Sequence, residues 1–165
     1  MVGPRRRARE IALQILTQMD VSPELTAKDG LRLYFDHLAA DASGEDAESW
    51  GAARPSPASA PAAPATAVAD RAMVDALVEG VTSRRAELDE IVQGLSRNWR
   101  LERMALVERN VIRLALYELK FGADVPTNVA LDEAVELTKR FGTAEGAAFV
   151  NGLLDRAVTE LSLRR

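Results

Sequence analysis

The chain has 165 residues, of which 47% are hydrophobic, and a formal net charge of −4. This length suits one domain or two small subdomains that share a core, and the charge excludes a generally basic nucleic-acid coat. The absence of cysteine excludes disulfides, thiolate zinc sites and thiol catalysis. No apolar run approaches the roughly 20 residues that span a bilayer, and no secretory signal precedes the first helix. We therefore expect a cytoplasmic protein without membrane contact.

The strongest local charge lies near the N-terminus, ahead of the first acidic residue, in Arg5, Arg6, Arg7 and Arg9. Apolar residues between Ala8 and Met19 follow the i, i+3, i+4, i+7 spacing of an amphipathic helix, so the helix begins inside the arginine cluster. Cations at a helix N-terminus oppose the macrodipole, at a cost of roughly 0.3–1 kcal/mol each at low salt. A bound polyanion would relieve that cost; the alternative is a basic helix start that is simply solvated.

A second amphipathic helix follows the turn at Ser22-Pro23 and is predicted to extend to residue 38. It carries His37, the single histidine, which has no second histidine or cysteine to complete a metal site. Residues 39–69 are rich in Ala, Pro, Ser and Gly, and hold too little apolar surface to offset the entropy of ordering. We predict a disordered, partly polyproline-II insert there, in which Trp50 either docks on the surface or is exposed.

Two further helices are predicted between residues 70 and 95 from the spacing of their apolar residues. Gly80 lies on the first of these helices, where it would allow close contact with a neighbouring helix. The polar connection that follows, residues 96–101, contains Trp99, which we expect to pack as a lid on the core.

The segment 111–155 predicts three helices joined by two short turns. The first is apolar on most of its circumference and should be enclosed by neighbours on several sides; its apolar residues are Val111, Ile112, Leu114, Ala115, Leu116 and Leu119. Gly122 and Gly142 end helices, and Pro126 opens a new one. We therefore predict an all-α fold of about seven helices in two packed helical subdomains, residues 5–38 with 70–83 and residues 84–163. The disordered Pro/Ala-rich loop, residues 39–69, interrupts the first of them.

No catalytic constellation is visible in the sequence. One histidine and no cysteine leave few general bases near neutral pH, and neither a Gly-rich phosphate loop nor a G-x-S-x-G elbow is present. Asp132, Glu133 and Glu136 share one helix, where such acids serve acid/base or metal chemistry, or simply favour the helix start. Gly152 costs its apolar helix roughly 1 kcal/mol relative to Ala, which indicates a close helix crossing or an approaching ligand. These residues predict a small helical adaptor, without catalysis, cofactor or metal, that binds an anionic partner through its N-terminus.

Four sequence blocks carry a resemblance to a known family: RRRAREIALQIL (5–16), VIRLALYEL (111–119), DVPTNVALDEAVELTKRFG (124–142) and FVNGLLD (149–155). In order and spacing they resemble the transcription antitermination factor NusB family, over nearly the whole chain except the insert. The fold of that family is all-α, with two helical bundles packed around a shared core, which agrees with the helices predicted above.

The resemblance implies a function. Proteins of this family pair with NusE, a ribosomal protein of the small subunit, and bind the boxA element of nascent single-stranded RNA. The complex joins other Nus factors on RNA polymerase and suppresses premature termination, notably during ribosomal RNA synthesis, without catalysis. Two alternatives stay open: a protein–protein scaffold without RNA binding, and a NusB-like module related to the ribosomal RNA cytosine methyltransferases. A monomer and a homodimer are both compatible with the sequence.

The resemblance also implies site residues at the start of the chain and in the central helix. Arg6 and Arg9 match family arginines that contact RNA. Arg5 and Arg7 belong to the same motif and are candidates for holding phosphates. Glu108 matches an acidic position on the side of the family that faces the protein partner.

Further site residues are implied around the last turn. Glu145 matches an acidic position at the RNA site, where a carboxylate would accept a hydrogen bond from a base amino group. Phe149 matches an aromatic near the same RNA, although its helical spacing equally predicts core packing. Thr17 and Thr127 depart from the family pattern, since each replaces an aromatic residue. The replacement at position 17 removes a stacking surface for a base. We expect the N-terminal arginines to lie near Glu145 and Phe149 on one surface.

Overall fold

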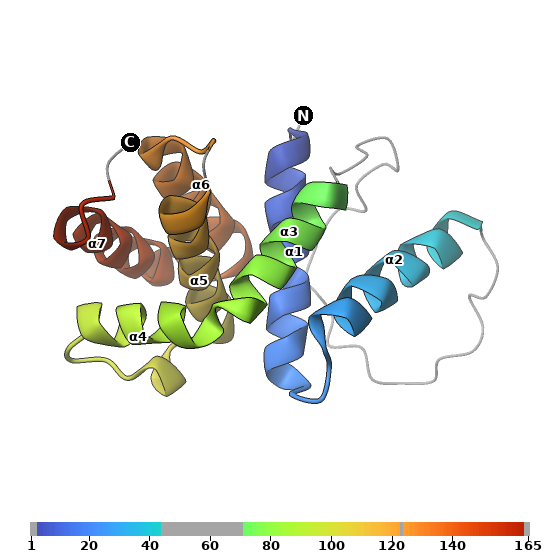
Figure 1. The fold of residues 1–165 in the computed structure, drawn as a ribbon, viewed down its shortest axis with the longest axis horizontal. Helices are drawn as coiled ribbons and strands as arrows, with labels where there is room; N and C mark the ends of the chain where they lie inside the picture. The colour runs from blue at the N-terminus through green and yellow to red at the C-terminus, as the bar shows by residue number, and fades with distance from the viewer. Residues whose placement is uncertain (1–2, 44–70, 123, 164–165) are drawn as a thin grey trace.

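The computed structural model describes residues 3–43, 71–122 and 124–163. These residues form seven α-helices and one 3-10 turn, with no strand among them (Figure 1). The elements are α1 (Pro4–Val21), α2 (Ala27–Ser43), α3 (Arg71–Ser83), α4 (Arg85–Leu95), η1 (Leu101–Arg103), α5 (Leu106–Phe121), α6 (Thr127–Phe141) and α7 (Ala144–Glu160). The predicted all-α fold is confirmed.

Helix α2 is longer than the sequence predicts, because it continues through residues 39–43. That stretch is rich in alanine, the best helix former, and the first proline of the insert, Pro55, comes only later in the chain. The start of the predicted insert is therefore helical. The rest of it, including Trp50, lies outside the described residues.

Helix α1 begins without the usual devices of a helix start. Gly3 is its N-cap and provides no side-chain hydrogen bond, and no acidic residue lies in the first turn. Pro4 at the first helical position sets a favourable backbone angle and has no N–H to leave unpaired. Negative charge for the arginines in this turn must come from elsewhere in the fold.

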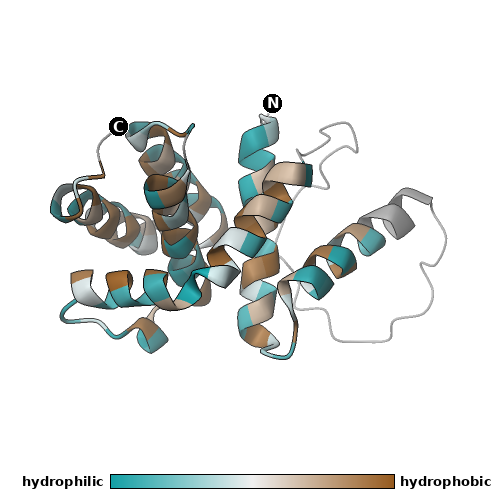
Figure 2. Ribbon diagram, viewed as in Figure 1, coloured by the Kyte–Doolittle hydropathy of each residue, from teal (hydrophilic) through white to brown (hydrophobic). Residues whose placement is uncertain are grey.

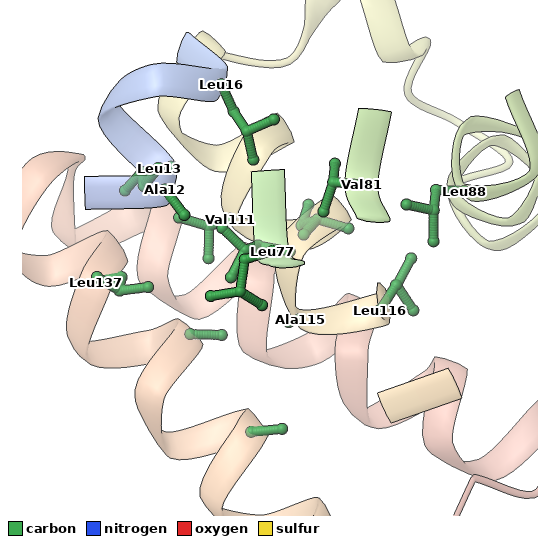
Figure 3. Packing of buried hydrophobic residues seen from close by; sticks show 14 of the residues in the cluster. Ala12, Leu13, Leu16, Leu77, Val81, Leu88, Val111, Ala115, Leu116 and Leu137 are labelled. Atoms are coloured by element: carbon green, nitrogen blue, oxygen red, sulfur yellow. The ribbon is translucent and has the colours of Figure 1, made fainter. Parts of the chain in front are cut away.

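Helix α5 is the central element of the fold, in contact with α1, α3, α4, α6 and α7. The six apolar residues that we predicted to be enclosed are all buried. Side chains of α1, α3 and α5 point into the space between these helices (Figure 3). Buried apolar residues from all seven helices meet in one cluster, so the predicted division into two subdomains stays a prediction.

A buried ionic cluster joins the end of α1 to α4 and α5. The Asp20 carboxylate, 1% exposed, accepts hydrogen bonds from Arg109 at 3.1 Å, Arg113 at 3.0 Å and Asn110 at 3.0 Å, and it also pairs with Arg85. Burial raises the pKa of Asp20, but the charge of Arg113, the hydrogen bond of Asn110 and the charges of Arg85 and Arg109 outweigh burial and lower that pKa. This cluster ties the helices together without adding apolar surface.

Three residues singled out in the sequence have different outcomes. The prediction for Gly80 is confirmed, because a Cβ added there would overlap the ring of Tyr117 on α5. The helix crossing suggested for Gly152 is wrong, since no other helix of the described residues comes within 4 Å of a Cβ at that position. The lid suggested for Trp99 is also wrong, since the residue is 52% exposed. Its neighbours Leu101 and Met104 contact the core in its place.

The remaining surfaces follow ordinary amphipathic patterning. Figure 2 shows hydrophilic and hydrophobic residues alternating along the helices, as expected of helices with one buried side. Within the described residues, no helix combines the length and the apolar character needed to cross a bilayer.

Candidate nucleic-acid interface

The arginine-rich start of α1 forms one wall of a surface pocket of about 420 Å³. The turn between α5 and α6 and the first half of α6 form the other wall. The residues that line this N-terminal pocket are Gly3, Arg5, Arg6, Arg9, Asp124, Val125, Pro126, Val129 and Glu133. The sequence predicted the arginines, but it did not indicate that the segment 124–129 lies against them.

Arg6 is positioned by Glu133 of α6. Its Nε donates to Glu133 Oε2 at 3.0 Å and its Nη2 donates to Glu133 Oε1 at 2.7 Å. The hydrogen bonds and charge of Glu133 raise the pKa of Arg6, whose guanidinium is cationic at physiological pH like that of any arginine. The side chain is 41% exposed, which leaves part of it accessible to a ligand in the N-terminal pocket.

Arg9 is held inside the protein. Its side chain is 3% exposed, and its Nε and Nη2 each donate to the Glu118 carboxylate of α5 at 2.9 Å. Its Nη1 lies 3.7 Å from Glu133 Oε2. In this structure Arg9 therefore connects α1 to α5 and α6, and the RNA contact implied for it stays a prediction.

The two other arginines of the motif differ from each other. Arg7 donates to Glu10 Oε2 at 3.0 Å, and Glu10 Oε1 in turn accepts from Arg140 of α6 at 2.5 Å. Arg5 is exposed and pairs with no acid among the described residues. Carboxylates of the protein itself therefore neutralise most of the positive charge that opposes the dipole of α1. Arg5 is the arginine of this motif whose charge remains available to a ligand.

The residues implied around the last turn gather at the start of α7. Thr143 caps this helix by accepting from Gly146 N at 2.9 Å, and its hydroxyl donates to Glu108 Oε1 at 3.3 Å. The Glu108 carboxylate lies so close to Gly146 that an added Cβ would overlap it. Glu145 is exposed in the first turn of α7. The residue implied for the protein partner and an acid implied for RNA are therefore neighbours.

Phe149 has the role that its spacing predicts. It is half-buried and packs against the hydrophobic core. The residue is not fully buried, and the RNA contact implied for it stays a prediction.

The arginines and Glu145 lie toward different ends of α6. Arg6 contacts Glu133 in the middle of this helix, and Glu145 follows its C-terminal end. The helical residues from Glu133 to Phe141 span roughly 12 Å. The ion pair between Glu10 and Arg140 lies between the two groups. A ligand that touches both would have to run along α1 and α6, because the groups do not form one compact cluster.

Thr127 and Thr17 are the two positions at which the resemblance leads us to expect aromatic residues. The Thr127 hydroxyl donates to the Leu163 carbonyl at 3.0 Å, which fastens the chain after α7 to the start of α6. The Thr17 hydroxyl is buried and has no hydrogen-bond partner among the described residues. The first substitution therefore has a structural use, and nothing in the structure explains the second.

Comparisons with known proteins agree with this architecture. The sequence model of the NusB family matches residues 6–159. The chain belongs to the NusB family. It is 42% identical over 162 residues to the transcription antitermination protein NusB of Myxococcus xanthus, covering 98% of this chain and 99% of that protein. It is 40% identical over 151 residues to the corresponding protein of Nitratidesulfovibrio vulgaris, covering 92% and 85% of the two chains.

Solved structures of NusB proteins share the fold. The T. maritima NusB structure superposes with a TM-score of 0.70 at 29% identity, covering 97% of this chain and 94% of that one. A structure of NusB and NusE in complex with double-stranded RNA gives a TM-score of 0.67 at 20% identity, covering 97% and 99%. At that identity the second likeness concerns the fold alone.

Proposed function

We propose that this chain is a non-enzymatic transcription antitermination factor that acts in the cytoplasm and binds boxA-type single-stranded RNA together with the ribosomal protein NusE. Its membership of the NusB family, whose relatives are named antitermination proteins, supports this function. The observation that carries the RNA-binding part is the N-terminal pocket, where the exposed Arg5 and the partly exposed Arg6 lie side by side with the turn between α5 and α6.

Arg5 and Arg6 hold the phosphates of the RNA. The hydrogen bonds from Arg6 to Glu133 use Nε and Nη2. The N–H groups of Nη1 are therefore the donors proposed to bind a phosphate. Because an arginine fork binds phosphate well, Glu133 orients Arg6 and at the same time competes for it. Arg9 and Arg7 act through the fold, since the first fixes α1 against α5 and the second supports Glu10.

Selectivity for bases comes from the start of α7. A carboxylate repels phosphate but accepts from the exocyclic amino group of a base, which is the role of the exposed Glu145. Phe149, which is only partly buried, offers an aromatic side chain on which an unpaired base can stack. Phosphate contacts along α1 then set the position of the strand, and contacts near α7 read it.

NusE binds beside this end of the molecule. Glu108 is the residue proposed to face it, and the hydrogen bond from Thr143 holds that carboxylate at the start of α7. A surface shared by Glu108 and Glu145 would let NusE and RNA support each other's binding. The assembled complex then joins other Nus factors on RNA polymerase, whether the free protein is a monomer or a homodimer.

A binding experiment separates this function from a scaffold without RNA binding. The protein is titrated into labelled boxA-type RNA and into a scrambled strand, with and without NusE. Tighter binding of the boxA-type strand, strengthened by NusE, supports the proposal. Equal affinity for both strands in both conditions would refute recognition of boxA, and no binding of either strand would favour the scaffold.

A charge-reversal variant tests the pocket itself. Arg5→Glu should weaken RNA binding and lower the slope of log K against log salt by about 0.7 for each lost phosphate contact. Arg32→Glu is the matched control, because Arg32 is 80% exposed on α2, away from the pocket. An equal loss of affinity in both variants would mean that net charge, and not the pocket, governs binding.

A further inference from the structure

The connection between α4 and α5 presents an aromatic side chain among unpaired positive charges. Trp99 is 52% exposed, and Arg97, Arg100 and Arg103 are exposed around it in sequence. Within the segment 96–104 these three arginines and one acid, Glu102, give a local charge of 3 − 1 = +2 in a chain of net charge −4. We call Arg97, Trp99, Arg100 and Arg103 the Trp99 platform.

The arginines of the Trp99 platform differ from the other exposed arginines of the described helices, with the exception of Arg5. The others pair with acids, either of their own helix, as Arg32 does with Asp36, Arg71 with Asp75 and Arg156 with Glu160, or of helix α1, as Arg85 and Arg140 do. In the described part of the chain, the guanidinium groups of the platform take part in no hydrogen bond or ion pair, although Glu102 is close in sequence. Their charge is therefore open to an external anion.

The indole is equally unoccupied. Other aromatic rings carry an arginine over one face, as in Arg71 over Phe35 at 3.7 Å and Arg84 over Phe121 at 3.9 Å. No ring or cation contact of this kind involves Trp99 among the described residues. An exposed indole that carries no cation on its face, and that has arginines beside it in the sequence, suits a ligand that is both planar and anionic.

The backbone beneath the platform is fixed by its own hydrogen bonds. Ser96 Oγ donates to the Trp99 carbonyl at 2.8 Å, and the Leu101 N–H donates to Gln93 Oε1 at 3.2 Å. Arg109 Nη1 donates to the Leu101 carbonyl at 3.4 Å, and the side chain of Met104 is buried in the core. Because the connection is already ordered, the binding of a ligand would not have to offset the entropic cost of ordering it.

We propose that the Trp99 platform is a second contact surface for single-stranded RNA, with Trp99 stacking on a base and the three arginines holding flanking phosphates. Proteins that bind single strands without strong sequence preference combine aromatic platforms with positive charge in this way. An acidic protein would satisfy the arginines but would make no use of the indole. The choice of RNA as ligand rests on the proposed function of the chain, whereas the surface is separate from the N-terminal pocket.

The position of the platform makes the two surfaces independent. In Figure 1 the connection between α4 and α5 lies at the lower left of the molecule, whereas the start of α1 lies at the top. A strand held at the N-terminal pocket therefore reaches the platform only with a further stretch of RNA. The platform would engage RNA that flanks the recognised element, and it should tolerate sequence changes there.

Tryptophan fluorescence tests the proposal directly. The chain contains two tryptophans, so the Trp50→Phe variant of the full-length protein reports on Trp99 alone. Titration with a twelve-residue oligouridine should quench this fluorescence saturably, with an affinity that falls as salt rises. Adding Arg100→Glu should weaken the binding and reduce the salt slope by about 0.7 or more, and adding Arg32→Glu should change neither. Trp99→Ala should weaken oligouridine binding, followed with a labelled strand, by roughly ten-fold.

Three results would overturn the platform. One is an unchanged Trp99 signal at saturating oligouridine, and another is equal weakening by Arg100→Glu and Arg32→Glu. The third is a polyglutamate peptide that quenches Trp99 as strongly as the RNA does, which would assign the surface to an acidic protein. Arg5→Glu keeps the two proposals apart, because it should weaken boxA-type RNA binding while leaving the quenching of Trp99 by oligouridine intact.

Discussion

Arg9 is the residue for which the family pattern and the geometry make different predictions. If it contacts RNA, its loss should weaken binding without affecting the fold. In the structure its guanidinium instead meets Glu118, and both side chains are almost fully buried. Arg9→Ala would leave the Glu118 carboxylate buried without its partner, and breaking a buried ion pair in this way costs about 3–5 kcal/mol.

The expected effect on thermal stability follows from that free energy. For a chain of this length, each kcal/mol shifts the midpoint of thermal unfolding by about 2–4 °C, so Arg9→Ala should lower it by about 6–20 °C. Glu118→Gln should also destabilise the protein but by less, because Arg9 Nη1 lies 3.7 Å from Glu133. Arg5→Ala alters an exposed side chain and should change the free energy of unfolding by about 0.5 kcal/mol or less.

Urea unfolding followed by far-UV circular dichroism measures these differences, and RNA binding is then measured at a temperature where every variant is folded. The structure predicts that Arg9→Ala and Glu118→Gln lose stability and keep most of their RNA affinity. Arg5→Ala should keep its stability and lose RNA affinity. A stable Arg9→Ala protein with lost RNA binding would refute this reasoning and make Arg9 a direct contact.

Three other predictions concern separate parts of the fold. Glu133→Gln should release Arg6 from its competing carboxylate and raise the affinity for boxA-type RNA in a fluorescence anisotropy titration; unchanged or weaker binding would contradict that competition. Gly80→Ala should destabilise the protein by about 1–3 kcal/mol through overpacking against Tyr117. Gly152→Ala should stabilise it by up to about 1 kcal/mol, because the new methyl group meets no neighbour within 4 Å in the part of the chain that the structure describes. Equal effects of the two variants in urea unfolding would contradict both assignments. The folded state lowers the pKa of Asp20 below its ordinary value of 3.8, so the stabilisation from this carboxylate is fully present above that value and is lost as the pH falls through the folded pKa. The stability difference between the parent and Asp20→Asn should therefore be constant from about pH 7 to about pH 5 and shrink below about pH 4, and a difference that grows toward acid pH would contradict the sign of the shift.

The sequence predicts the helical scaffold well because the signals for it are local. The apolar circumference of α5 indicates a central helix, and the glycines after α5 and α6 mark their ends. The helical end of α2 was missed because the change in composition at residue 39 suggested disorder, whereas the alanines there favour helix. The exposed position of Trp99 was missed because Leu101 and Met104 fill the core beside it.

The candidate site was predicted in its residues but not in its interactions. The pairs between Arg9 and Glu118 and between Arg6 and Glu133 join positions 109 and 127 residues apart, and no periodicity within a helix indicates such partners. One signal was available in the sequence: Glu118 is an acid inside a largely apolar helix, and a buried carboxylate needs a cation. Reading that acid together with the arginine block would have suggested a structural role for one of the arginines.

Cross-linking of boxA-type RNA to this chain in the presence of NusE, with the modified peptides identified by mass spectrometry, tests the central claim most directly. The N-terminal pocket predicts cross-links in residues 3–6 and 124–129, lost on competition with unlabelled boxA-type RNA and retained with a scrambled strand. Specific cross-links confined to other surfaces, with none at the start of α1 or at the turn before α6, would contradict the assignment of this pocket to RNA.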